Sequence, residues 1–237
     1  MNREYHQWYS SSLGRVMELL VFGHAGAPVI VFPTSMGRFY QYEDSEMVEA
    51  LKDRLDNGWL QLFCIDSVDN ESWYNNHVPP YERINRHIAY DRYVTEEVLP
   101  FIRNKNQNNF IITTGCSFGA FQSVNYGFRH PEIVRKIVAQ SGRYNVHTYL
   151  DGFVNNDVYY NVPVDYIGGL GEGDFTNKLR RQEIFLVVGE WDVPVCLYET
   201  KQLAGILELK GISHHLDIWG GYDHDWPAWR TQIRKYL

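Results

Sequence analysis

Short apolar runs alternate with helical patterns along the chain of 237 residues. The apolar runs are rich in Val, Ile and Phe and end at turn residues, which is typical of strands buried on both faces. They predict strands at residues 16–22, 28–32, 59–65, 110–114, 137–140, 184–188 and 215–219. Residues 5–22 together favour a hairpin that adds antiparallel strands at one edge of the sheet.

Between these runs, apolar residues recur at helical spacing. They predict helices at residues 45–57, 81–103, 117–128, 197–209 and 226–236. Pro100 predicts a kink or a late break in the second of them. The alternation predicts a doubly wound α/β fold, with a mostly parallel central sheet, helices on both faces and a single domain over residues 1–237.

Residues 143–182 depart from this alternation, because they are rich in Asn, Gly and Tyr and too long for a simple crossover. Two interpretations have equal support. The segment forms a lid or pocket wall, or it is a surface excursion with a short helix of its own.

Net charge and cysteine spacing indicate which partners, compartment and bound groups the protein is expected to have. The net charge of −7 disfavours nucleic acid and anionic membranes as partners. The polar start has no apolar leader, and the three cysteines are odd in number and far apart, so we expect a cytoplasmic protein with reduced thiols. No metal or cofactor is expected, since the glycines at 168–171 follow no convincing strand and cysteine pairs are lacking.

The sequence Gly115-Cys116-Ser117-Phe118-Gly119 lies between an apolar strand and an amphipathic helix. This is the context of a nucleophile elbow, in which a serine occupies a very tight turn and its neighbours two places away must lack side chains. A Gly-rich turn with an idle serine is the alternative. The context favours Ser117 as a nucleophile.

A serine nucleophile needs a base, and the base needs an orienting acid. In the fold that uses this elbow, the chain order is Ser, acid, His. Asp192 follows the strand at 184–188 and is favoured as the acid, with Glu190 as its rival. His224 follows the last strand and is favoured as the base, because the other histidines lie at unsuitable places.

The oxyanion of a tetrahedral intermediate needs hydrogen-bond donors. One is expected from the N–H of Phe118, directly after the nucleophile, and the other from the loop after the strand at 28–32, where Met36 is favoured and Ser35 is the alternative. Residues 66–74 should lie at the same edge of the sheet, and Trp73 is expected to border the substrate. The carboxylates of this loop fit no EF-hand spacing, so a hydrogen-bonded loop is favoured over a calcium site.

Four motifs resemble the esterase D-like "putative esterase" branch of the α/β hydrolases, which includes mycolyltransferases and feruloyl esterases. They are Trp8-Tyr9-Ser10 with Met17–Gly23, Pro33–Gly37, the elbow with Gln140-Ser141-Gly142, and His224-Asp225-Trp226-Pro227-Ala228-Trp229. The resemblance implies an α/β-hydrolase fold, triad roles for Ser117, Asp192 and His224, and a place for Trp226 beside the site. The oxyanion loop departs from the usual glycine-containing turn.

The leading hypothesis is a serine esterase that cleaves a small-molecule carboxylic ester through an acyl-enzyme intermediate. Acyl transfer to an alcohol or sugar would use the same triad and is the first alternative. A non-catalytic binding module on the same fold is the second. Because the aromatic fraction is high, at 15%, a phenol- or sugar-linked ester is favoured as the substrate.

Overall fold

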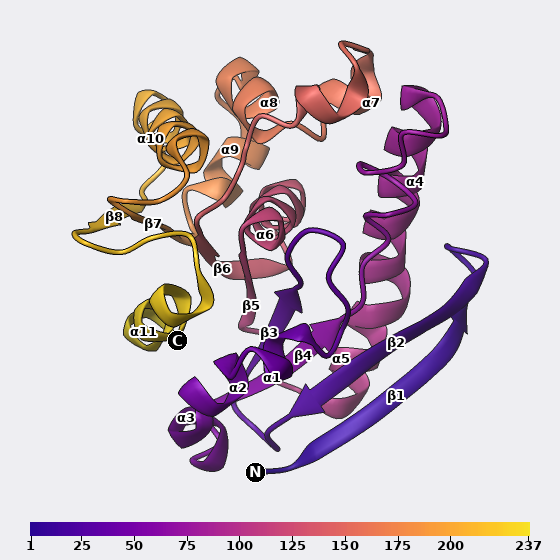
Figure 1. Ribbon diagram of the computed structural model, residues 1–237, viewed down its shortest axis with the longest axis vertical. Coiled ribbons are helices and arrows are strands. Elements are labelled where there is room, and N and C mark those ends of the chain that lie inside the picture. The colour runs from indigo at the N-terminus through magenta and orange to yellow at the C-terminus, as the bar shows by residue number, and fades with distance from the viewer.

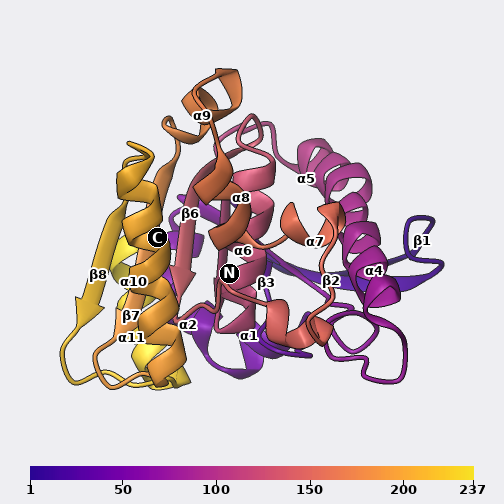
Figure 2. The ribbon, with the colours of Figure 1, turned by 90° about the horizontal axis from the view of Figure 1, so that it is seen from above.

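The computed structural model describes all 237 residues and places eight strands in one sheet (Figure 1). The strands are β1 (Arg3–Ser10), β2 (Arg15–Phe22), β3 (Ala27–Phe32), β4 (Leu60–Ile65), β5 (Ile111–Cys116), β6 (Val134–Gln140), β7 (Glu183–Gly189) and β8 (His215–Trp219). Their spatial order is β1-β2-β4-β3-β5-β6-β7-β8. β1 and β2 pair antiparallel, as does β2 with β4, and all pairs from β4 to β8 are parallel. Figure 2 shows β6 and β8 running in the same direction.

The helices cover both faces of the sheet. They are α1 (Gln41–Asp44), α2 (Met47–Ala50), α3 (Lys52–Asp56), α4 (Pro80–Tyr93), α5 (Leu99–Lys105), α6 (Phe118–Arg129), α7 (Asn156–Tyr159), α8 (Pro163–Gly169), α9 (Asp174–Leu179), α10 (Pro194–Leu209) and α11 (Trp226–Tyr236). A large core lies under α4, α6, α8 and α10, and a smaller one lies under α2, α3 and α11 on the opposite face. The prediction of a doubly wound α/β fold is therefore confirmed.

The apolar runs predicted these strands correctly because β3, β4 and β5 are buried almost throughout. A strand buried on both faces needs apolar residues on each of them. The hairpin at the start is also confirmed, as β1 and β2. β1 and β8 form the two edges of the sheet, and β8 leaves Leu216 and Ile218 partly exposed.

Two helix predictions need correction. The helix expected at 45–57 is divided into α2 and α3 at Leu51, whose φ of −107° and ψ of 8° are not helical. The helix expected at 81–103 extends from Pro80 to Lys105, and a π-helical segment, Val94–Val98, joins α4 to α5. Pro100 lies just after this wide turn. The chain thus accommodates a residue without an N–H and continues without a break.

The segment 143–182 carries a 3₁₀ turn, His147–Leu150, followed by α7, α8 and α9. Several of its apolar side chains, among them Val158, Ile167 and Leu179, are fully buried in the larger core. α8 packs on α6 and α10, and α7 packs on α4. The segment is therefore built into the helical layer of the fold, with more helices of its own than the sequence predicts.

All three cysteines are free and buried. None of the helices combines the length and the apolar character that crossing a membrane requires.

Candidate active site

Ser117 occupies the turn between β5 and α6, with φ 56° and ψ −120°. This is a strained conformation for a residue with a side chain. A Cβ on Gly115 would lie 2.4 Å from the backbone of Gly119, and a Cβ on Gly119 would lie 2.4 Å from the carbonyl oxygen of Phe32. The Ser117 N–H donates to the Gln140 carbonyl at 2.9 Å. The turn therefore needs both glycines, and it holds the serine, half-buried, at the carboxyl end of the sheet.

The structure brings Ser117, His224 and Asp192 together from the loops after three different strands. His224 Nε2 lies 3.0 Å from Ser117 Oγ, and His224 Nδ1 lies 2.7 Å from Asp192 Oδ1. The Asp192 side chain is fully buried, while 23% of the His224 side chain is exposed. A buried acid thus faces one ring nitrogen, and the other ring nitrogen faces the serine hydroxyl near solvent.

The rival acid Glu190 lies elsewhere. Its side chain is exposed, and its Oε2 accepts a hydrogen bond from the Gly221 N–H at 3.3 Å. Asp192 is the carboxylate that the turn after β7 carries to His224.

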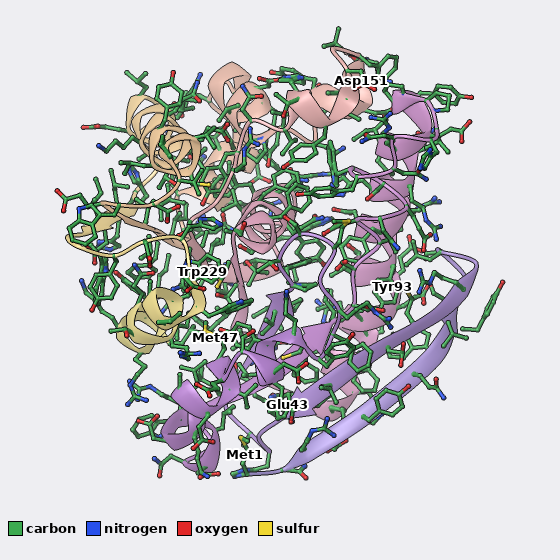
Figure 3. The ribbon with its side chains drawn as sticks, viewed as in Figure 1. Met1, Glu43, Met47, Tyr93, Asp151 and Trp229 are labelled. Carbon is green, nitrogen blue, oxygen red and sulfur yellow. The ribbon has the colours of Figure 1, made fainter.

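Two side chains that sequence reasoning did not assign to the site support Asp192. Ser141 donates to Asp192 Oδ2 at 2.5 Å, and the indole of Trp229 donates to Ser141 Oγ at 2.8 Å. The Val193 N–H donates to Asp192 Oδ1 at 2.7 Å. Trp229, labelled on α11 in Figure 3, also packs edge-on against the His224 ring, with 4.9 Å between centroids. The sequence could have pointed to Trp229, because it is the last residue of the motif that begins at His224.

Of the two tryptophans expected beside the substrate, one lies near His224 and the other lies in the core. Trp226 is partly buried and packs at 5.0 Å against Trp229, which in turn contacts His224. Trp73 is fully buried in the core against His87 and Phe121, so its expected contact with substrate is wrong. Tyr74, the next residue, is the one that reaches the surface near the elbow.

Of the two expected oxyanion donors, the N–H of Phe118 is free and the N–H of Met36 is already bonded. Phe118 is the first residue of α6, so its N–H has no acceptor within the helix. The Met36 N–H does not face an open site, because it donates to Asp69 Oδ2 at 3.2 Å. Asp69 is buried, and its other oxygen accepts from the Gln122 side chain at 3.1 Å. Burial raises the pKa of Asp69 to about 7.

Aromatic side chains form one wall beside the elbow. The rings of Tyr74 and Tyr149 pack edge-on against Phe118, at 5.3 and 5.4 Å between centroids. The Tyr74 hydroxyl donates to Ser35 Oγ at 2.7 Å and lies 3.2 Å from the Tyr149 hydroxyl. Tyr149 comes from the segment 143–182, so part of that segment lies against the residue that follows the nucleophile.

Asp192, Cys196 and His224 place three potential metal-ligating atoms within 4.8 Å of one another. Burial raises the pKa of the Cys196 thiol to about 12, so the sulfur stays protonated and is a poor ligand. Asp192 and His224 already bond to each other and to Ser141 and Ser117. This cluster therefore belongs to the hydrogen-bonded arrangement around the serine.

A surface hollow of about 410 Å³ is lined by Arg129, Tyr160, Tyr166, Leu170 and Phe175. Arg129 ends α6, about 18 Å along the helix from Ser117. This hollow is separate from the serine and its partners.

Comparison with known families identifies the class of protein. The chain matches the family described as "Putative esterase" over residues 33–237. It belongs to this family. The protein is therefore an ester hydrolase, and the family predicted from its motifs is confirmed.

Solved structures support the fold of this esterase. A ferulic acid esterase superposes with a TM-score of 0.80 at 16% identity, covering 100% of this chain and 96% of the other. An S-formylglutathione hydrolase from Agrobacterium tumefaciens has a TM-score of 0.76 at 14% identity, covering 99% and 92%. A ferulic acid esterase from Anaeromyces mucronatus has a TM-score of 0.75 at 13% identity, covering 100% and 89%. The esterase thus has the α/β-hydrolase fold. A comparison with curated protein sequences finds no match.

Proposed function

We propose that this esterase hydrolyses small carboxylic esters through an acyl intermediate on Ser117. The observation that carries the proposal is the continuous hydrogen-bonded path from Ser117 through His224 to the buried Asp192. A serine hydroxyl has a pKa far above neutrality, and a neutral imidazole at hydrogen-bond distance supplies the base that it needs.

The reaction proceeds in two halves. Ser117 Oγ attacks the ester carbonyl carbon while its proton moves to His224 Nε2, and the carbonyl oxygen becomes an oxyanion. The carbonyl then re-forms, and the alcohol leaves with the proton from His224. Water, deprotonated by His224, attacks the acyl group in the same way and releases the acid.

Asp192 orients the imidazole and stabilises its cation in both halves. The first oxyanion donor is the Phe118 N–H, at the N-terminus of α6, where the helix dipole also favours negative charge. The second donor comes from the loop after β3.

We assign to the site an ester with an aromatic acyl group. Tyr74 and Tyr149 pack on the buried ring of Phe118 and are themselves partly exposed, so they offer aromatic faces beside the elbow. Aromatic pairs gain energy beyond their area of contact. Two of the structurally similar proteins are named ferulic acid esterases, and ferulic acid is an aromatic acid.

The proposal is tested with Ser117→Ala, assayed with p-nitrophenyl acetate. We expect the turnover to fall by at least about 10⁴-fold, because the nucleophile is lost. Ser213→Ala is the matched control, since Ser213 is exposed and lies before β8, at the opposite end of the strands from the nucleophile. Turnover by a folded Ser117→Ala protein at the level of the control would reject the proposal.

A further inference from the structure

The turn formed by residues 34–37 lies beside the nucleophile. β3 and β5 are adjacent and parallel, and Phe32 pairs in register with Gly115. The residues that follow these two positions therefore leave the sheet side by side at the same edge. A Cβ on Gly119 would lie 2.6 Å from the Pro33 carbonyl oxygen, so the start of the turn touches the first turn of α6. Ser35 is thus held next to the elbow.

Only one backbone N–H of this turn is without a partner. The Gly37 N–H donates to the Thr34 carbonyl at 2.8 Å, and the Thr34 N–H donates to the Gln41 side chain at 2.9 Å. The Met36 N–H is held by Asp69, which is only 1% exposed and is itself fixed by Gln122. The Ser35 N–H has no partner. The peptide that carries it cannot turn freely, because the amides on both sides are bonded.

The Ser35 hydroxyl has a proton that nothing in the structure engages. Tyr74 donates its only hydroxyl proton to Ser35 Oγ at 2.7 Å. At 3.2 Å, the Tyr149 hydroxyl can therefore only donate to Tyr74. Each donation polarises the next hydroxyl in the chain, which makes Ser35 a stronger donor. Ser35 is half-buried, so it faces both this chain and solvent.

We propose that Ser35 is a catalytic residue that donates both its N–H and its O–H to the oxyanion, and that Tyr74 is a positioning residue that acts through the Ser35 hydroxyl. The inference rests on the ester hydrolysis proposed above. When Ser117 Oγ bonds to the carbonyl carbon, the π-electron pair moves to oxygen. The Phe118 N–H, the Ser35 N–H and the Ser35 O–H then hold that oxygen. Ser35 keeps its proton throughout, and all proton transfer passes through His224.

The substitution Ser35→Ala removes the hydroxyl and keeps the N–H. We expect kcat to fall by about 100-fold while KM changes less than about threefold, since the oxyanion exists only in the transition state. Tyr74→Phe keeps the aromatic ring and removes the donor to Ser35. It should lower kcat by about fivefold in the wild-type protein and by less than twofold in the Ser35→Ala background, because the group through which it acts is then missing.

The matched controls are Ser213→Ala and Tyr160→Phe, at two exposed positions away from the elbow. Fluorophosphonate labelling of Ser117 is followed to completion on every variant. Its final extent should match that of the wild type, because folded enzyme is labelled in full, while its rate should fall in parallel with kcat. Wild-type kcat in Ser35→Ala would overturn the catalytic role of the Ser35 hydroxyl. Losses that multiply in the double variant would overturn the positioning role of Tyr74. Full turnover by Ser117→Ala would instead reject the underlying function.

Discussion

Ser141 offers a sensitive test of how the orienting acid is supported. Ser141→Ala removes one of the three hydrogen bonds that the buried Asp192 carboxylate accepts from His224, Val193 and Ser141. A hydrogen bond to a charged group contributes roughly 1.5–3 kcal/mol, and the Trp229 indole N–H would also lose its acceptor, at a cost of about 1–3 kcal/mol. We therefore expect unfolding free energy to fall by about 2–4 kcal/mol after partial relaxation.

The effect on turnover should be smaller than the effect on stability, because Val193 still holds Asp192 in place. We expect kcat to fall by about tenfold, which corresponds to about 1.4 kcal/mol of transition-state stabilisation. Activity is measured with p-nitrophenyl acetate at saturating concentration, and stability is measured by urea unfolding.

Ser141→Gly separates the hydrogen bond from backbone strain. Ser141 has a φ of 58°, in the left-handed region, where a glycine avoids a penalty of about 1 kcal/mol. The glycine variant should therefore be more stable than the alanine variant by about that amount, with the same loss of kcat. Recovery of wild-type kcat in Ser141→Gly, or an unchanged kcat in a destabilised Ser141→Ala, would refute the supporting role of the Ser141 hydroxyl.

Two further predictions concern the acid behind the oxyanion loop and the acyl pocket. Because burial raises the pKa of Asp69 from 3.8 to about 7, the stability that its proton contributes is complete below pH 4 and is lost as pH rises through 7, by about 4 kcal/mol in all. Asp69→Asn should therefore gain unfolding free energy relative to wild type between pH 5 and pH 8 in urea titrations, and a difference independent of pH would contradict this. Methyl cinnamate should be hydrolysed with a kcat/KM about tenfold above that of methyl hexanoate, and Tyr149→Ala should abolish this advantage by removing an aromatic face. A ratio of the two kcat/KM values that is the same in the wild type and in Tyr149→Ala would exclude an aromatic acyl pocket.

The strands and the positions of Ser117, Asp192 and His224 could be predicted from the sequence because each depends on a local pattern. An apolar run ends, a turn follows, and parallel strands bring their carboxyl ends to one edge of the sheet. The fold that uses the nucleophile elbow supplied the expected chain order of serine, acid and histidine. None of these inferences required knowledge of which way a loop side chain turns.

The surroundings of the triad could not be predicted, because they depend on contacts between distant residues. Asp69 accepts a hydrogen bond from the Met36 N–H, which lies 33 positions away in the sequence. Ser141 accepts one from Trp229, which lies 88 positions away. In the loop after β4, the direction of two neighbouring side chains decides the outcome. Trp73 points into the core and Tyr74 points toward the elbow. Tertiary packing settles such directions, and residue type alone does not.

Trapping the acyl intermediate tests most directly whether Ser117 is the nucleophile. The protein is mixed with excess p-nitrophenyl acetate at low pH, quenched within milliseconds and examined by peptide mass spectrometry. We expect one acetyl group per molecule on the peptide that contains Ser117, and none in Ser117→Ala. Acetylation at another residue, or rapid turnover with no burst of p-nitrophenol and no acetylated Ser117, would contradict it.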